Sequence, residues 1–353
     1  MKNNINFLLL FFLLLISCDH KRKECVDNIF SYSTFPQEKV LKGEMIELDT
    51  AIFRYPFRIR IEGNRAIVMD LHGPDCYGHL FQYPDFRYLS SFGRHGDSPT
   101  EMLSMENFRL RDREVWTLDA NKSELTRLEL SSSGDSLLRD ETVTLGEDIL
   151  RPLDFAICDD TTFIIPDYSG ESRFCKIGRH GKLMDKMGAI PTVNEEALKK
   201  ACPAFAQAWR SFIDYNPNNG ILAAVTQLGE VVEIYNLKDS THVVRIGEHG
   251  EPEFQMSDGY GIPTGIMGFS DVQVTESAIY AVFHGTSFKE IARQSGRLPD
   301  GGKYIYVFSL KGEPLCKYVL DHYIYGIWVD EATKTIMATD VNSDQPILKF
   351  DFG

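Results

Sequence analysis

Hydrophobic and polar positions alternate in short runs along most of this chain, and the runs recur as a four-strand unit. The stretch from Asn107 to Leu130 shows most of one unit: a strand with charged residues, a polar turn, an apolar strand ending in Asp119, a second turn and a third strand. Short apolar runs bounded by turn residues are typical of strands, whereas amphipathic helices repeat every three to four residues. The pattern therefore predicts an all-β protein.

The apolar second strand of the unit recurs six times. Its first three copies end in Asp70, Asp119 and Asp167, which lie 49 and 48 residues apart, and inserts widen the later gaps. The six copies are 66–70, 115–119, 163–167, 221–225, 278–283 and 335–340. Four strands per unit at this period predict a six-bladed β-propeller with four antiparallel strands per blade. The alternative is an open sandwich of many strands, which does not require a sixfold repeat.

The last unit ends at Phe352 after its third strand, so the ring needs one more strand from elsewhere in the chain. We expect the N-terminal run 45–48 (Met-Ile-Glu-Leu) to supply it, because this would pair two strand edges that are otherwise open to aggregation. The propeller is then expected to span residues 44–353, and a propeller uses that length as one domain.

The first 17 residues combine a charged start with an apolar run from Ile5 to Ile16 that is too short to span a bilayer. This composition predicts an export signal over residues 1–17. The signal ends in Leu-Ile-Ser-Cys, which resembles the bacterial lipobox. The resemblance implies cleavage before Cys18 and lipidation of Cys18, which makes a membrane a partner of the protein. In the alternative, the signal is an ordinary secretory one and Cys18 is incidental.

Residues 18–43 are polar and irregular, with a basic cluster at 21–23. We expect them to form a tether that holds the propeller away from the membrane. The protein is expected in the bacterial cell envelope, with the outer membrane favoured as its anchor. The propeller would lie either in the periplasm or at the cell surface.

Composition excludes some classes of function. The formal net charge is −14 and the sequence pI is about 5.1, whereas a nucleic-acid-binding protein needs a basic surface. The seven cysteines are scattered without a C-x-x-C pair, so the sequence indicates neither a zinc site nor a disulfide framework. We expect a monomer that does not bind nucleic acid.

Two connectors between units resemble each other, at 92–102 and 246–256. Their pattern resembles the Gly-x-x-Gly-x-x-Pro-x-Glu-Phe connector of NHL-type six-bladed propellers, although the first connector departs from it at Thr100. The core over residues 40–353 resembles the TolB-like six-bladed propeller lipoproteins of Bacteroidetes. The resemblance implies the propeller fold and leaves the function open.

Two inserts break the repeat. Residues 194–208 are predicted to form a helix with Asn194 as its N-cap and an interruption at Pro203, and residues 284–302 are predicted to form a long, partly basic loop. Both are expected on the face that carries the inter-blade loops and the loops between second and third strands, which we call the upper face. We expect a protein or glycan partner there, and the candidate contact residues are His95, His249, His284, Lys289 and Arg293.

Metal binding is a separate possibility. Histidines on one face could hold a metal, but loop histidines are more often plain surface residues. Gluconolactonase-type propellers hold calcium with carboxylates and an amide at the starts of inner strands, and Asn107, Asp154 and Asp271 occupy such places here. The aspartates that end the second strands are expected to cap turns rather than to act in chemistry.

The sequence contains no phosphate-binding glycine loop, no G-x-S-x-G nucleophile elbow and no H-E-x-x-H helix. It favours a lipid-anchored binding or interaction module without a cofactor. The alternative is a metal-dependent hydrolase or lactonase with a central calcium-type site.

Overall fold

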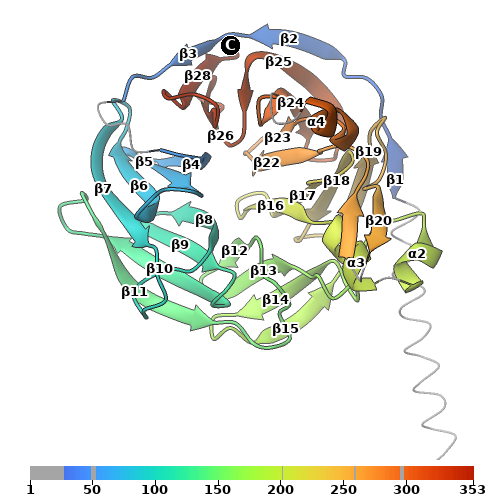
Figure 1. The fold of residues 1–353 in the computed structure, drawn as a ribbon, viewed down its shortest axis with the longest axis horizontal. Helices are drawn as coiled ribbons and strands as arrows, with labels where there is room; N and C mark the ends of the chain where they lie inside the picture. Colours follow the sequence, from blue (N-terminus) through green and yellow to red (C-terminus); the bar gives the residue numbers. More distant parts are fainter. Residues whose placement is uncertain (1–27, 49–52, 201, 258–259, 295–297) are drawn as a thin grey trace, which may run out of the picture.

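The computed structural model describes residues 28–353 apart from 49–52, 201, 258–259 and 295–297. Six antiparallel sheets are arranged as a ring around a central axis, so the predicted six-bladed β-propeller is confirmed (Figure 1). Residues 1–27, which include the expected export signal, Cys18 and the first part of the expected tether, lie outside the described residues. In the part of the chain that is described, no helix is long and apolar enough to cross a membrane.

The first three blades each contain four consecutive strands, ordered from the axis to the rim. Blade 1 contains β4 (Pro56–Glu62), β5 (Arg65–Asp70), β6 (Cys76–Gln82) and β7 (Arg87–Arg94). Blade 2 contains β8 (Met105–Arg111), β9 (Glu114–Asp119), β10 (Glu124–Leu130) and β11 (Leu137–Thr144). Blade 3 contains β12 (Ala156–Asp159), β13 (Thr162–Pro166), β14 (Phe174–Gly178) and β15 (Leu183–Met187).

The other three blades complete the ring. Blade 4 contains β16 (Ser211–Asn216), β17 (Ile221–Thr226), β18 (Val231–Asn236) and β19 (Thr241–Ile246). Blade 5 contains β22 (Phe269–Val274), β23 (Ala278–Phe283), β24 (Gly302–Ser309) and β25 (Pro314–Ile324). Blade 6 contains β26 (Ile327–Asp330), β27 (Thr335–Thr339) and β28 (Ile347–Asp351). Every residue of β17 and β23 is buried, because neighbouring blades cover both faces of these second strands.

The N-terminal segment closes the ring. β3 (Gly43–Met45) pairs antiparallel with β28, with Met45 opposite Leu348, and so becomes the fourth strand of blade 6. The expected closing strand is therefore confirmed in its role, although it lies slightly earlier in the chain than 45–48. Beyond it, the amide of Ile46 continues the pairing by donating to the carbonyl of Ile347.

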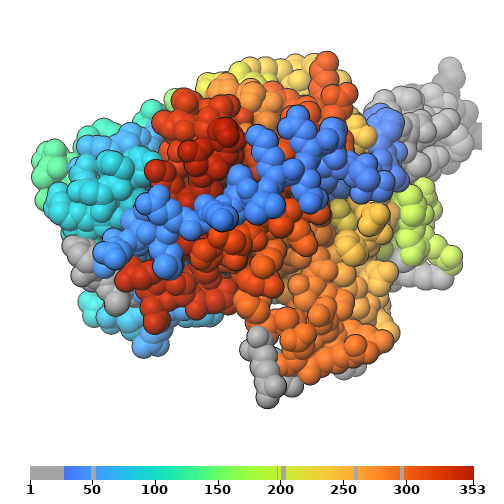
Figure 2. Space-filling model, turned by 90° about the horizontal axis from the view of Figure 1, so that it is seen from above, coloured from blue at the N-terminus to red at the C-terminus, as the bar shows by residue number. Residues whose placement is uncertain are grey.

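Part of the expected tether is instead built into the propeller, and this corrects the boundary at residue 43. β1 (Ile29–Ser31) pairs parallel with β19, and β2 (Gln37–Leu41) pairs parallel with β25, so the segment runs along the outer rim (Figure 2). The exposed edges of β19 and β25 offer unpaired backbone groups, and an added strand satisfies them. Leu41 is also buried there, although most of β2 is exposed.

The inserts contain more regular structure than predicted. The first forms two helices, α2 (Glu195–Lys200) and α3 (Cys202–Ala208), and Pro203 lies in the first turn of α3 rather than at the interruption. Proline is tolerated there because the first amides of a helix have no partner inside it. The second insert, predicted as a loop, contains the helix α4 (Phe288–Gln294). A hairpin of β20 (Phe254–Ser257) and β21 (Tyr260–Pro263) lies between blades 4 and 5.

Candidate functional site

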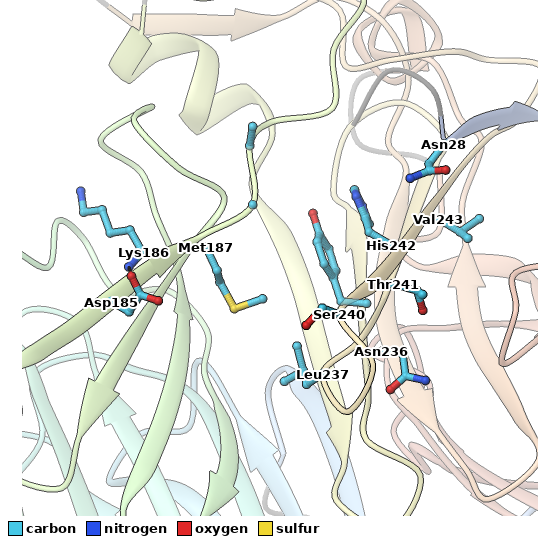
Figure 3. A pocket seen from close by; sticks show the side chains of 13 residues that line it. Asn28, Asp185, Lys186, Met187, Asn236, Leu237, Ser240, Thr241, His242 and Val243 are labelled. Atoms are coloured by element: carbon cyan, nitrogen blue, oxygen red, sulfur yellow. Dashed lines mark hydrogen bonds between the residues drawn. The ribbon is translucent and has the colours of Figure 1, made fainter. Parts of the chain in front are cut away.

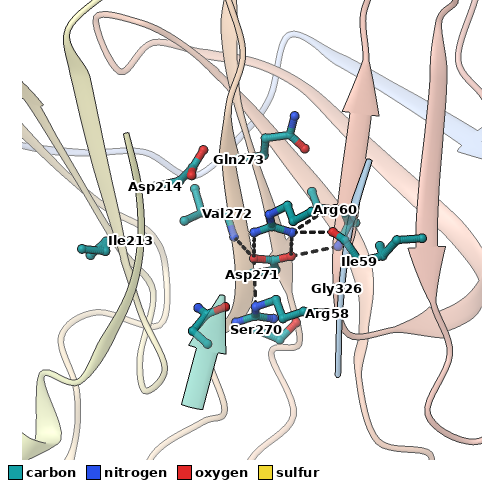
Figure 4. Close-up of polar contacts among 12 residues, drawn as sticks. Arg58, Ile59, Arg60, Ile213, Asp214, Ser270, Asp271, Val272, Gln273 and Gly326 are labelled. Atoms are coloured by element: carbon teal, nitrogen blue, oxygen red, sulfur yellow. Dashed lines mark hydrogen bonds and ion pairs between the residues drawn. The ribbon is translucent and has the colours of Figure 1, made fainter. Parts of the chain in front are cut away.

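The innermost strands place charged side chains on the central axis. Asp271 of β22 accepts two hydrogen bonds of 3.0 Å from the guanidinium of Arg60, and the Nε of Arg58 lies 3.4 Å from its Oδ1 (Figure 4). Both arginines come from β4, on a different blade. Burial alone would raise the pKa of Asp271, but the two guanidinium groups outweigh burial and hold that pKa below its usual value.

A second buried cluster lies around Asp154, just before β12. Its Oδ1 accepts hydrogen bonds of 2.8 Å from the Asn107 amide, the Arg109 guanidinium and the backbone of Phe155. Its Oδ2 accepts a hydrogen bond of 2.9 Å from the backbone of Ile213. These bonds connect the inner strands of three blades and hold them in a fixed arrangement.

The three residues proposed as calcium ligands are thus already engaged. Asn107 donates to Asp154, and Asp271 is held by arginines, so a cation would have to displace these partners. Among the described residues, no group of three or more His, Cys, Asp or Glu side chains is placed to hold a metal. The calcium site stays a prediction, and the arrangement of these donors does not favour it.

A cavity of about 170 Å³ lies at the upper mouth of the axis, between blades 4, 5 and 6. We call it the mouth pocket. Its lining is mostly aromatic and apolar, and the polar side chains of Gln227 and His284 could form hydrogen bonds with a ligand. The lining residues are Phe212, Gln227, Leu228, Met267, Gly268, Phe269, Ser270, His284, Phe288 and Tyr325. Ser270 already donates its hydroxyl to the carbonyl of Tyr325.

His284 follows β23 directly and is 8% exposed. Its Nε2 is buried and has no hydrogen-bond partner among the described residues. Burial lowers the pKa of His284 to about 4, so the imidazole is neutral near pH 7. A neutral imidazole in this position can donate or accept one hydrogen bond through Nε2.

Arg58 lies behind the pocket wall. Its Cζ is 4.1 Å from the ring centre of Phe57 and 4.3 Å from that of Phe212, which lines the pocket. The side chain is fully buried, and in the described structure its Nη2 has no hydrogen-bond partner. Burial lowers the pKa of Arg58 to about 10, so it keeps its charge at neutral pH.

The remaining predicted contact residues are spread over the upper face. His95 stacks on Tyr77 with the ring centres 3.8 Å apart, and His249 is exposed, with its backbone amide donating to Glu230. Lys289 and Arg293 are exposed on α4, next to the mouth pocket. Only His284 lines that pocket. The role of the five residues as ligand contacts stays a prediction.

The aspartates that end the second strands cap turns, as the sequence predicted. In the turns that follow the strands, Asp70 accepts a hydrogen bond from the backbone of His72, and Asp119 accepts one each from the backbones of Asn121 and Lys122. Arg58 was not predicted from the sequence as a residue of the site. The one available signal was the alternation of Arg58 and Arg60 with apolar residues in β4, which indicates charges turned towards the axis.

A larger groove of about 750 Å³ lies on the outer rim between blades 3 and 4 (Figure 3). Asp185, Lys186 and Met187 border one side, and Tyr235 and His242 lie on the other with their rings stacked 3.8 Å apart. Behind the rings, Glu233 accepts a hydrogen bond from the hydroxyl of Tyr235 and forms a buried ion pair with Arg173. The groove is therefore supported by an internal polar network.

Comparison with solved structures shows the same fold at low sequence identity. An exported protein from Bacteroides fragilis is 11% identical, with a TM-score of 0.55 over 92% of this chain and 98% of that one. An auxiliary nutrient binding protein from Bacteroides ovatus is 10% identical, with a TM-score of 0.52 over 85% of this chain and 69% of that one. The WD40 repeats of RRP9 are 8% identical, with a TM-score of 0.51 over 90% and 99%.

No curated protein matches the sequence. The model of the TolB-like 6-blade propeller-like family matches residues 33–332, which is most of the chain. The match begins within the rim segment and covers the mouth pocket. This chain belongs to the TolB-like six-bladed propeller family.

Proposed function

We propose that the protein is a lipid-anchored binding module of the cell envelope, and that its upper face contacts a protein or glycan partner. The observation that carries this proposal is the gathering of three inserts on one face of a regular propeller. α2–α3 and β20–β21 lie in inter-blade connections, and α4 lies between the second and third strands of blade 5. All three therefore belong to the upper face, and a bridge between Ile266 and Ser287 joins the hairpin exit to the start of α4.

The inserts also present apolar side chains to solvent. Val193 is 70% exposed, Met256 is 50% exposed and Ile262 is 51% exposed, and these residues flank α2 or belong to the hairpin. Apolar side chains gathered on an otherwise polar surface are typical of contact surfaces. The closed ring below holds the inserts in place, so that binding costs little ordering entropy. The names of the two Bacteroides proteins support a role in export and binding.

Site-specific photocrosslinking in cells tests the upper face. A photoreactive amino acid at Lys289, on α4, is expected to capture a partner. The matched control is Lys311, which is exposed on the same blade in the turn between β24 and β25, on the opposite face. Capture only at Lys289 supports the proposal. Equal capture at both positions, or capture at Lys311 alone, contradicts it.

Anchoring through Cys18 is tested separately. We expect the wild-type protein in the membrane fraction of lysed cells and the Cys18→Ala variant in the soluble fraction, because one residue carries the whole lipid modification. Detergent should then release the wild-type protein. Retention of Cys18→Ala in the membrane fraction would show that the anchor lies elsewhere.

A further inference from the structure

We propose that the mouth pocket binds a small organic carboxylate with a flat apolar body, and that His284 and Arg58 recognise its carboxylate. The inference rests on the proposed function for the choice of the upper face, and it adds a ligand class and a site. The pocket is a separate feature from the surface that α4 presents to a partner. Its test can therefore fail while the crosslinking at Lys289 succeeds.

The size of the pocket sets the size of the ligand. Its volume is about 170 Å³. An engineered apolar cavity of about 150 Å³ holds one benzene molecule. The mouth pocket therefore fits one six-membered ring or an apolar body of similar size. The rings of Phe212, Phe288 and Tyr325 line it, and aromatic rings favour offset or edge contacts with another flat ring.

The polar groups around the pocket indicate a hydrogen-bond acceptor on the ligand. The Nε2 of His284 is buried in the pocket wall and lacks a partner in the part of the chain that is described. A buried polar atom without a partner costs free energy, so a ligand acceptor at this atom would remove that cost. Gln227 lines the same pocket and can add an amide donor.

The charge behind the wall favours an anion over a neutral acceptor. Both carboxylate oxygens of Asp271 accept hydrogen bonds from Arg60. Arg58 forms only a longer ion pair with Asp271, in which its Nε lies 3.4 Å from Oδ1. The Arg58 guanidinium is fully buried and lies 4.3 Å from the ring centre of Phe212, which lines the pocket. In a buried setting of low dielectric, this charge attracts a carboxylate across the ring without direct contact.

Two acids oppose this attraction: Asp271, which is the ion-pair partner of Arg58, and Asp300. Asp300 accepts a hydrogen bond of 2.5 Å from the hydroxyl of Tyr55, and its charge acts on both His284 and Tyr325. A carboxylate in the pocket would be repelled by Asp300 and attracted by Arg58. Neutralising Asp300 should therefore strengthen carboxylate binding, and neutralising Arg58 should weaken it. A purely apolar pocket would show neither change.

The experiment measures binding of benzoate and of its neutral isostere benzamide to the full chain in detergent, by ligand-observed NMR titration. For benzoate we expect a Kd on the order of 1 mM, as suits a fragment of this size. We expect benzamide to bind at least about tenfold more weakly. Asp300→Asn should strengthen benzoate binding about threefold and leave benzamide unchanged. Lys311→Ala, on the opposite face, should change neither.

Two further variants test the named contacts. His284→Phe keeps a ring of similar size and removes the donor, so benzoate should bind about tenfold more weakly. Arg58→Gln should abolish the preference for benzoate over benzamide. If this variant does not fold, His284→Phe and Asp300→Asn still test whether the pocket recognises a carboxylate. Equal binding of benzamide and benzoate, or no binding of either at about 20 mM, would overturn the proposal. Unchanged benzoate binding by His284→Phe would also overturn it.

Discussion

The middle of the central axis, which we call the channel, and its upper mouth both bury polar side chains, but the polar atoms of the two regions differ in their hydrogen bonding. In the channel, Asp271 accepts four hydrogen bonds, two from Arg60 and two from the backbone of Val272 and Ile327. At the mouth, the Nε2 of His284 has no partner among the described residues. On the axis the Nη2 of Arg58 and the Nε of Arg109 also lack one, but each of these guanidinium groups is paired with an aspartate through another nitrogen. Buried polar atoms are normally bonded, so this contrast separates a region that stabilises the ring from one that can bind a ligand.

The largest effect on stability is expected for a substitution in the channel. Asp271→Asn keeps the shape of the side chain but removes the carboxylate that pairs with the buried Arg58 and Arg60, and it should lower the free energy of unfolding by about 3–5 kcal/mol. Chemical denaturation of the variant and the wild type measures this difference. Glu195→Gln is the control, because its exposed ion pair with Lys199 on α2 should contribute no more than about 0.5 kcal/mol. A loss of less than about 1 kcal/mol for Asp271→Asn would show that the channel network does not stabilise the ring.

The second effect is a loss of folding stability at acidic pH, caused by the buried histidines. Burial lowers the pKa of His79, His242 and His284 to about 4 in the folded protein, below the value of about 6.5 in the unfolded chain. Between those values the unfolded chain binds more protons, so the stability present above about pH 6.5 is lost as the pH falls towards 4. Each histidine should contribute up to about 1.4 kcal/mol per pH unit in this window.

The His284→Phe variant separates the contribution of the mouth histidine to this pH dependence from the contributions of His79 and His242. The free energy of unfolding, measured from pH 7 to pH 4, should fall less steeply in His284→Phe than in the wild type. The control is His79→Phe, which removes a similar histidine within blade 1, where His79 bonds Ser91. An unchanged slope in His284→Phe would mean that the mouth histidine titrates near its ordinary pKa, and that water reaches it.

The propeller itself was predictable from the sequence because its signal is local. Each second strand is apolar on both faces, and in four of the six blades an aspartate such as Asp70 ends the strand or directly follows it and caps the next turn. The repeat is therefore visible without knowledge of distant contacts. The rim strands escaped prediction because β2 buries only Leu41 and has no alternating pattern. Helix α4 buries none of its residues, so it leaves no helical hydrophobic period in the sequence.

The site was predictable only in part, because its chemistry depends on contacts between blades. His284 was expected on the upper face, and the structure places it in the mouth pocket. Arg58 and Asp271 are 213 residues apart, and no short-range pattern shows that they pair. For that reason the sequence suggested Asp271 only as a metal ligand, whereas in the structure Asp271 is the countercharge of two arginines.

The smallest effect on stability is expected at the outer wall of the pocket. Phe288 lies on α4, which has no buried residues, whereas Phe269 forms the inner wall and is 2% exposed. Phe269→Ala should cost about 3–5 kcal/mol, as is usual for a buried phenylalanine. Phe288→Ala should cost less than about 1 kcal/mol and yet weaken benzoate binding, because the side chain contributes to the pocket rather than to the core. Thermal melts and NMR titrations of both variants test this. A large loss of stability in Phe288→Ala would make α4 a structural part of the ring, and the contrast between channel and mouth would then not extend to this wall.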